Sequence, residues 1–401
     1  MQETASSLRR RLELAAELRR EYHDVIEGRV VEPRFPEWCE RRGWSQFLLG
    51  LGDEQVALIE QVGLPHAVEK LRAVPEELAW LCGRVRSLIE QVPLAPLLSS
   101  EPLETCHVAQ RKRPQIRALV ELCRRELPRP RRVVDVGAGL GHVTRALADA
   151  LGVEAFGVEL LASRASRAQA LSGGRASFVV ADASSGLPVE PGDLVVGLHA
   201  CGGLGDTLLT QAAAANAHVA LVSCCLQKVA GEVRPALSRQ GRALGVECSR
   251  RTLGLSNVSS ADAGETMVRI IQSRAVRHAL RRALEARGLD VPAGEETRGV
   301  HRRQFRRGLA TALGLALGHR GLPPATAAEV AHFEQLGRQE YGVIRRASLP
   351  RSALGRLLEL LVALDRAVFL EERGHRTALL ALVASQVTPR NLTLLACAGG
   401  S

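Results

Sequence analysis

The sequence predicts an α/β fold in which a mostly parallel sheet has helices on both faces, with a helical domain before it and a helical insertion after it. Between residues 131 and 227, short β-rich runs alternate with helical stretches, which is typical of βαβ units. The flanking regions read as helical, and two apolar runs close the chain. We therefore expect four segments, at residues 1–104, 105–234, 235–362 and 363–401.

The first hundred residues carry apolar side chains at helical spacing, as in RRRLELAAELRREY and EQVALIEQVGLPHAVEKL. Trp38 and Trp44 flank a turn and are expected to anchor a core, and prolines at 93, 96 and 102 mark the end of the region. The N-terminus is charged and lacks an apolar stretch, so no secretory signal is expected. No run is long enough to cross a membrane.

The composition indicates the class of protein and the compartment to expect. With 401 residues, 46% of them hydrophobic, the chain is long enough for two or three domains. Its nine cysteines lack the spacing of a disulfide scaffold, so we expect reduced thiols and a cytoplasmic location. The net charge of +10 favours a polyanion such as RNA as a partner. The alternative is a compositional preference for arginine, because the sequence has lysine only at 70, 112 and 228.

The elements of the central region follow one another with short connections. In order, the expected strands and helices are RRVVDVG, GHVTRALADALG, EAFGVEL, SRASRAQALSG, ASFVVAD, GDLVVGLHA, TLLTQAAAANA and HVALVSCC. Near the end, RTALLALVAS and NLTLLACA are two apolar runs separated by a loop. We expect them to add an antiparallel pair to the sheet, with Arg390 and Asn391 fixing the last strand.

A glycine-spaced turn follows the first strand and indicates a nucleotide site. Asp135 is followed by Gly137, Gly139 and Gly141. A dinucleotide fingerprint needs a small residue at its sixth position, which here is His142. His142 therefore argues against a dehydrogenase, and the lack of a phosphate-binding lysine after the turn argues against a P-loop enzyme. The spacing D-x-G-x-G-x-G instead resembles the first motif of class I S-adenosylmethionine-dependent methyltransferases, whose glycines lie against the methionine part of the cofactor.

Two acidic residues follow at the ends of the next two strands. Glu159 stands 22 positions after Gly137, and its carboxylate can accept both ribose hydroxyl protons. Asp182, followed by Ala183, can accept from an adenine amino group. Each acid could also be a solvated strand-end carboxylate. Ligands of open α/β sheets bind at the carboxyl ends of the strands, so the three features together predict a cofactor cleft for S-adenosyl-L-methionine.

The fourth and fifth strands end in GLHACGGLGD and VSCCLQKV, which places His199, Cys201, Cys224 and Cys225 near one sheet edge. In one interpretation His199 shapes a substrate pocket, and Asp206 caps the next helix. In a second, the cysteines bind zinc; strand alternation argues against it, because it points Cys224 and Cys225 to opposite faces, so we predict no metal. In a third, a cysteine is the nucleophile toward a pyrimidine. The cysteines could equally be buried fillers.

Several motifs together resemble the methyltransferase-domain family that contains methyltransferase-like protein 25. They are VVDVGAGLGH, GVELLASRASRA, VVADAS, GLHACGGLGD, SCCLQKV, LDRAVFLEERG and VTPRNLTLLA, and they extend from about residue 105 to the end. The resemblance implies a Rossmann-like class I methyltransferase sheet. In one segment the chain departs from the family: where members read roughly S-P-K-K-x-H-E, it has AQRKRPQI, with Pro114 and Gln115 in place of the histidine and the acid.

The sequence therefore predicts a methyltransferase that uses S-adenosylmethionine and acts on RNA (tRNA or rRNA) or on protein. The expected catalytic residues are His199, Cys201 and Lys112, and His199 also borders the cofactor. Lys112 and Lys228 lie within motif segments, and we expect both near the substrate entrance. The alternative is a module that binds the cofactor, has weak or no catalysis, and serves in interactions.

Overall fold

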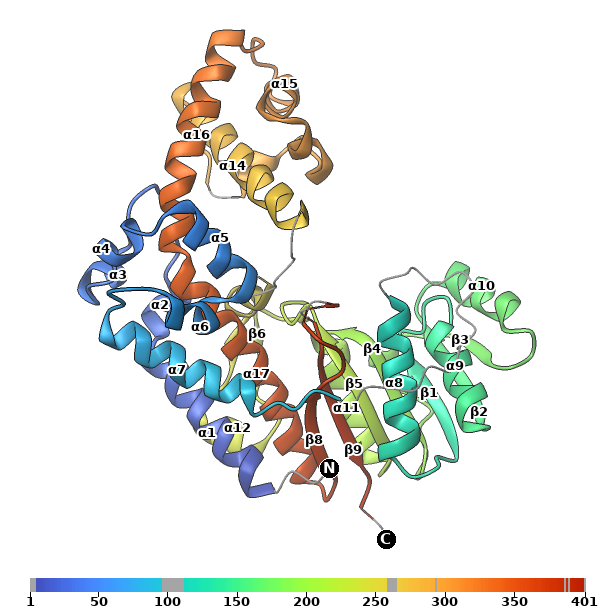
Figure 1. Ribbon diagram of the computed structural model, residues 1–401. Coiled ribbons are helices and arrows are strands. Elements are labelled where there is room, and N and C mark those ends of the chain that lie inside the picture. The colour runs from blue at the N-terminus through green and yellow to red at the C-terminus, as the bar shows by residue number, and fades with distance from the viewer. Residues whose placement is uncertain are drawn as a thin grey trace. The chain divides into compact units, whose positions relative to one another are not determined.

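The computed structural model describes residues 5–95, 112–257, 265–292, 294–385, 387–388 and 390–399 (Figure 1). The chain forms two compact units. The first comprises Met1–Ile26, Arg84–Ser260 and Leu354–Ser401, and the second comprises Glu27–Gly83 and Ala261–Ala353. The predicted segments were contiguous, whereas each unit is assembled from separate stretches of chain. Pro96, Pro102 and the start of AQRKRPQI lie outside the described residues.

A seven-stranded sheet forms the centre of the first unit. Its order is β3-β2-β1-β4-β5-β9-β8. Strands β1 to β5 pair in parallel, and β9 is antiparallel to both β5 and β8, so the predicted fold class and the closing antiparallel pair are confirmed. The strands are β1 Arg132–Val136, β2 Glu154–Glu159, β3 Ser177–Val180, β4 Leu194–Cys201, β5 His218–Cys224, β8 Arg376–Ala381 and β9 Leu392–Cys397. Asn391 fixes the turn before β9 by donating to the Val383 carbonyl at 2.8 Å.

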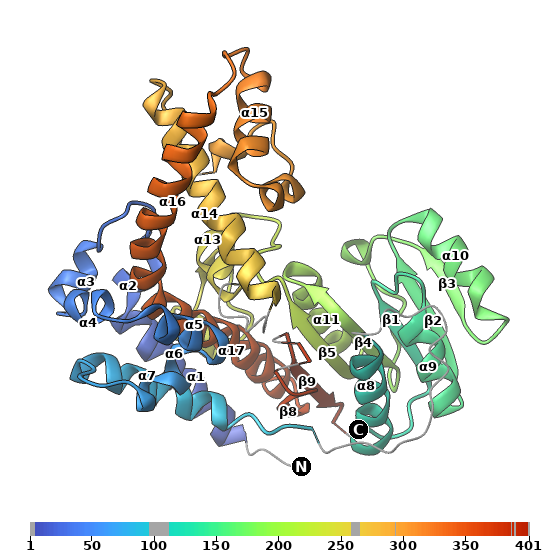
Figure 2. The same ribbon diagram turned by 45° about the horizontal axis from the view of Figure 1, so that its top comes forward.

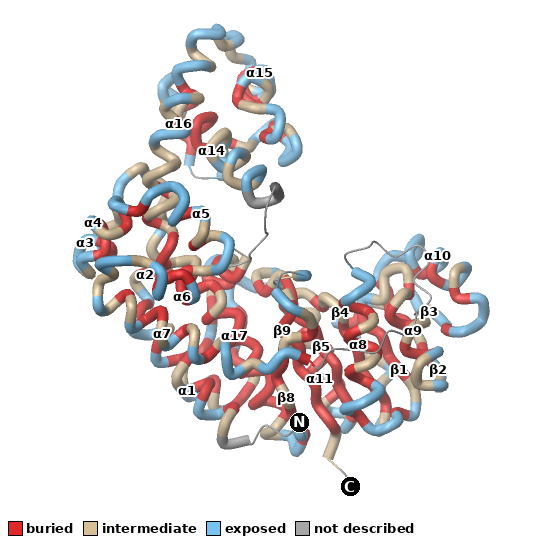
Figure 3. Tube along the Cα trace, viewed as in Figure 1, coloured by how far each residue is buried: buried red, intermediate tan, exposed pale blue. Residues whose placement is uncertain are grey.

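Helices cover both faces of this sheet, because successive strand residues point to opposite sides. Val133, Val196 and Val222 pack with helices α8 (Arg113–Glu126) and α9 (His142–Leu151) in one core cluster. On the other face, Leu208 of α11 (Gly203–Ala214) lies against Gly197 and Leu221. The buried strands between these helices are red in Figure 3.

The remaining elements of the first unit lie around this core. Helix α1 packs on α12, and Arg19 of α1 donates to the Gly245 carbonyl at 2.9 Å. A small antiparallel pair, β6 with β7, stands apart from the main sheet. The bounds are α1 Ala5–Glu21, α2 His23–Glu27, α10 Ala162–Ser172, η3 Ala183–Ser185, β6 Val233–Arg234, α12 Arg239–Leu244, β7 Cys248–Ser249, α13 Arg250–Gly254 and η4 Leu255–Asn257. Helices α2, α7 (Glu76–Glu90) and α17 (Leu349–Glu371) each contain a boundary between the units.

The second unit is helical, and Figure 2 shows its helix α14 beside α16. Phe305, Leu313 and Phe333 are among the apolar side chains of its core. Trp38 and Trp44 are both buried, with ring centroids 6.2 Å apart, so their predicted role as core anchors is confirmed. The elements are α3 Glu37–Arg41, α4 Ser45–Leu49, α5 Asp53–Val62, α6 Leu64–Ala67, η1 Val68–Lys70, α14 Glu265–Ala286, η5 Glu295–Thr297, η6 Arg302–Arg307, α15 Leu309–His319 and α16 Ala327–Ala347.

Helix length and polarity bear on the membrane prediction. Within the part of the chain that the structure describes, every helix is too short or too polar to span a lipid bilayer.

Candidate functional site

The glycine turn after β1 reverses the chain so that α9 can begin beside the sheet. Gly137, Gly139 and Gly141 all have positive φ angles, of 74°, 60° and 72°. A side chain on Gly141 would overlap the ring of Phe178 on β3, whereas one on Gly139 would meet nothing within 4 Å. In a dinucleotide fingerprint the sixth residue must be small because it packs closely against the strand. Here the closely packed residue is Gly141, one position earlier. Gly139 instead leaves backbone accessible to a ligand.

Glu159 joins the first two β-to-α corners. Its Oε2 accepts the amide proton of Gly139 at 2.9 Å, and its Oε1 accepts that of Leu161 at 3.0 Å. The carboxylate is buried, with 6% of the residue exposed. The backbone amide of Ala181 donates to the Glu159 carbonyl at 3.1 Å, so the third corner lies at the same sheet edge. Glu159 is thus the residue at which the three corners meet.

The other two predicted acidic residues make local contacts. Asp135 is buried and accepts from the Thr144 hydroxyl at 2.6 Å, which ties β1 to α9. Burial raises the pKa of Asp135 to about 6, although the hydrogen bond from Thr144 opposes this. Asp182 is exposed and accepts from the Ser184 amide at 2.8 Å, and this bond lowers its pKa. Ala183 follows it in the short helix η3, is buried, and accepts from Gln211 at 3.0 Å.

The ends of β4 and β5 bring the predicted cysteines together. The register shifts between Leu198 and Ala200, and His199, half-buried at this bulge, has a φ of 65°. Cys201 pairs with Cys224 across the strands, and the sulfur atoms of these two and Cys225 all lie within 4.8 Å of one another. The expectation that Cys224 and Cys225 point to opposite faces is therefore wrong. Cys225 has a φ of 29°, so strand alternation has already ended there.

The sequence suggested that Asp206 caps α11, but the structure shows that it does not. The N-cap is Gly202, and the Asp206 carboxylate instead accepts from two buried arginines, Arg234 at 2.9 Å and Arg366 at 2.8 Å. Arg366 also donates to the Gly202 carbonyl and to Ser223, both within 2.8 Å. This network holds the turn after β4 against α17. Sequence analysis missed it because Arg366 lies 160 residues from Asp206.

The two predicted entrance lysines lie in different elements of the first unit. Lys112 is exposed and occupies the N-cap position of α8. Pro114 lies in the first turn of that helix, where a missing amide proton costs no hydrogen bond, and Gln115 is buried. Lys228 is exposed in the loop after β5, and its charge acts on Cys201.

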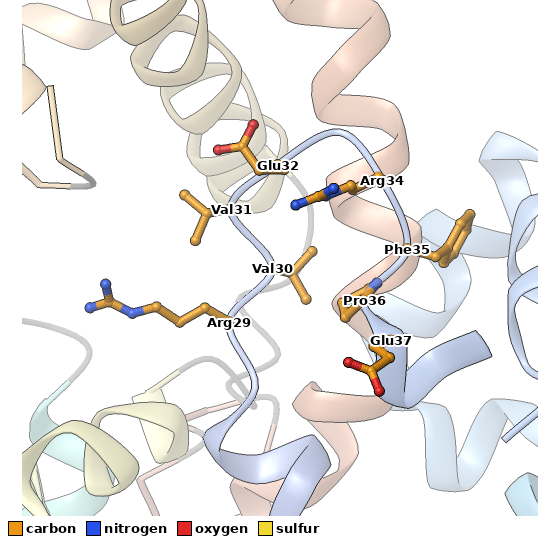
Figure 4. A pocket seen from close by; sticks show the side chains of 8 residues that line it. All are labelled: Arg29, Val30, Val31, Glu32, Arg34, Phe35, Pro36 and Glu37. Atoms are coloured by element: carbon orange, nitrogen blue, oxygen red, sulfur yellow. The ribbon is translucent and has the colours of Figure 1, made fainter. Parts of the chain in front are cut away.

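The second unit has a separate, open pocket of about 490 Å³, lined by residues 29–32 and 34–37. Figure 4 shows the side chains of Val30, Glu32 and Pro36 around it. None of the predicted site residues lines this pocket. The predicted site residues lie instead in the first unit.

Comparison with known families identifies the domain. Residues 111–232 match a family model described as a methyltransferase domain. The match covers β1 to β5 and includes all ten predicted site residues, from Lys112 to Cys201. The fold and this domain are those of S-adenosylmethionine-dependent methyltransferases, and S-adenosylmethionine is the cofactor that such a domain uses.

Solved methyltransferase structures show low similarity to the chain. A TehB-like S-adenosylmethionine-dependent methyltransferase from Corynebacterium glutamicum is 17% identical, with a TM-score of 0.23, over 37% of this chain and 72% of its own. Coclaurine N-methyltransferase, bound to N-methylheliamine and SAH, is 15% identical, with a TM-score of 0.24, over 54% and 61%. The 23S rRNA methyltransferase ErmE is 17% identical, with a TM-score of 0.25, over 59% and 98%. These similarities assign no substrate to the chain.

The residues at the sheet edge fit the cofactor. The space around Gly139 is open, and a buried carboxylate lies directly behind it. Leu160, Leu161 and Val180 adjoin the second and third corners and are 63%, 46% and 53% exposed. A ligand that covers apolar side chains removes them from water, which favours its binding. An adenosine group could cover them while its ribose meets Glu159.

Replacing Gly202 by alanine is expected to destabilise the first unit by about 2–4 kcal/mol, since the new Cβ would overlap the Lys228 carbonyl oxygen at a φ of 48°. The matched control is Gly203→Ala, because a Cβ there lies 3.7 Å from the same oxygen. Thermal unfolding of both variants gives the comparison. Equal melting temperatures for the two variants would contradict the predicted clash.

Proposed function

We propose that the chain is an S-adenosylmethionine-dependent methyltransferase that acts on RNA. The observation that carries the first part is the junction at Glu159, where one buried carboxylate binds the amides of two successive corners. In this proposal Glu159 holds the ribose, Asp182 and Ala183 border the adenine, and Gly137, Gly139 and Gly141 lie along the methionine part. Asp135 supports this site by fixing α9.

The chemistry required of the protein is modest, because the cofactor, when bound, supplies a methyl group that is already electrophilic. The chain has to align the acceptor in line with that methyl and exclude water. His199 is proposed to orient the acceptor or to take its proton, since the bulge places the residue at the end of β4. Lys112 and Lys228 are proposed to attract an anionic acceptor, and Cys201 borders the same edge.

The acceptor class is inferred from charge in the second unit. Helix η6 carries Arg302, Arg303, Arg306 and Arg307, all exposed, here called the arginine face. Phe305 of the same helix is buried in the helical core and anchors η6 there. No ion pair to an acidic side chain involves the arginine face within the described residues, whereas Arg282 and Arg287 of the same unit both pair with glutamates. Exposed, uncompensated guanidinium groups favour binding to phosphates.

Charge removal at the arginine face is expected to weaken RNA binding in a salt-dependent manner. Arg302→Ala/Arg303→Ala should lower the slope of log affinity against log salt by roughly 1.4, because each phosphate contact to a single strand contributes about 0.7. The control is Arg9→Ala/Arg10→Ala, which removes two adjacent exposed arginines from α1. Titrations of both variants with total RNA at several salt concentrations measure the slopes. Equal slopes would contradict the RNA-binding role of the face.

The function itself is tested by cofactor binding and methyl transfer. Calorimetry should detect binding of S-adenosylhomocysteine and no binding of NAD. Cell extract incubated with protein and methyl-tritiated cofactor should then show label in the RNA fraction. Label in the protein fraction instead would overturn the RNA acceptor, and cofactor binding without any transfer would favour the interaction module. Absence of cofactor binding by folded protein would overturn the proposal.

A further inference from the structure

Three thiols gather where β4 and β5 end. Cys201 is the last residue of β4, Cys224 the last of β5, and Cys225 follows directly. Their sulfur atoms lie within 4.8 Å of one another, and those of Cys201 and Cys224 are 2.9 Å apart. Within the described residues they are the only group of three or more histidine, cysteine or acidic side chains close enough to hold a metal ion. By contrast, Cys39, Cys123 and Cys397 are buried and belong to no such group.

The backbone builds this cluster in two ways. The bulge at His199 restores the pairing of Cys201 with Cys224 on neighbouring parallel strands. Cys225 then leaves the strand with a φ of 29°, which turns its side chain toward the other two. Positive φ is uncommon outside glycine, and residues held in that region often lie at ligand sites. The sulfur atoms are thus positioned by the backbone rather than by chance packing.

The cluster contacts one backbone carbonyl and lies near one lysine. The thiols of Cys201 and Cys224 both donate to the His199 carbonyl, at 3.4 and 3.3 Å. Lys228, in the loop after β5, supplies a positive charge that acts on Cys201. A metal ion bound by the three sulfur atoms would displace their protons.

We propose that Cys201, Cys224 and Cys225 bind one zinc ion through three thiolate ligands. Soft sulfur donors select zinc over magnesium or calcium. Two sulfur atoms on one zinc lie roughly 3.8 Å apart, given bonds of about 2.3 Å and tetrahedral angles, so Cys201 and Cys224 need to separate slightly on binding. Cys201 and Cys225 are half-buried, which gives the ion access and leaves its fourth position to solvent. The positive charge of Lys228 offsets the net negative charge of a three-thiolate zinc site.

The test is metal binding by the reduced full chain without cofactor, so its result is independent of the methyltransferase proposal. Cobalt, as a spectroscopic substitute, should give a thiolate-to-metal charge-transfer band at one equivalent, and zinc should displace it. Zinc should also slow alkylation of Cys201 and Cys225 by iodoacetamide. Cys201→Ala and Cys225→Ala should each weaken zinc binding at least ~100-fold, measured by competition with a chromogenic chelator. The matched control is Cys397→Ala, a buried cysteine of the same sheet.

Three results would overturn the proposal. One is a cobalt spectrum without a thiolate band. Another is zinc affinity that is the same in Cys225→Ala as in Cys397→Ala. The third is a disulfide between Cys201 and Cys224, found by mass spectrometry, that persists in the presence of reductant.

Discussion

Replacing Glu159 by alanine is expected to reduce affinity for S-adenosylhomocysteine by at least ~100-fold. The variant loses the proposed ribose contact and leaves the amides of Gly139 and Leu161 without their carboxylate. Each amide left without an acceptor raises the free energy of the folded protein by about 1–3 kcal/mol. The glycine turn is expected to become less ordered as a result. Calorimetric titration of folded protein measures the loss.

The matched control for this prediction is Glu154→Ala, since Glu154 begins the same strand and is exposed. Glu159→Gln keeps the shape of the side chain but has one acceptor oxygen, so it should fold and lie between wild type and Glu159→Ala. Unchanged affinity for S-adenosylhomocysteine in both Glu159 variants would show that Glu159 is not part of the cofactor site. Circular dichroism shows whether the alanine variant retains its sheet.

The largest loss of stability is expected from Asp206→Ala. Its carboxylate pairs with Arg234 and Arg366, which are each 1% exposed, and buried Asp365 provides the second carboxylate by pairing with Arg234 at 3.0 Å. Removing one partner of a buried ionic network leaves uncompensated charge and costs about 3–5 kcal/mol. Urea unfolding measures the change. The control is Asp149→Ala, whose carboxylate pairs with Arg175 at 3.4 Å on the surface, where the loss should be within ~1 kcal/mol.

The same network gives a pH signature. Burial raises the pKa of Asp206, but attraction to Arg366 and Arg234 outweighs it and the net shift is downward. A carboxyl group whose pKa is depressed by folding stabilises the protein above its unfolded value, 3.8 here, and this contribution is lost as the pH falls through the folded value. The stability difference between wild type and Asp206→Ala should therefore be constant near neutrality and shrink below about pH 4. A difference that grows in acid would contradict the assignment.

Local sequence pattern was sufficient for the sheet and for the order of the corners. Alternating β-rich and helical stretches predicted β1 to β5, and the spacing of the glycine turn from Glu159 predicted two corners at one edge, where Glu159 accepts from Gly139. Each of these features involves residues within thirty positions of one another. Over so short a stretch, chain connectivity limits how the strands and corners can be arranged. The roles of the predicted site residues in binding and catalysis remain predictions.

Features that depend on contacts between residues far apart in the chain could not be predicted from the sequence. The partners of Asp206 come from β6 and α17, and no local pattern links them. The convergence of Cys224 and Cys225 depends on one positive φ, which strand periodicity cannot express. The joining of residues 27–83 with 261–353 likewise follows from packing between helices far apart in the chain, such as the ion pair of Arg345 with Glu60 at 2.5 Å.

The double contact of Glu159 has a consequence for how tightly a ligand can bind. Because the carboxylate already fixes both corners in the free protein, the entropy of ordering these loops is lost during folding and not during association. These two corners are therefore pre-organised. Ligand affinity then depends on the contacts formed and the water released, and the binding heat capacity should reflect only the apolar area that is covered.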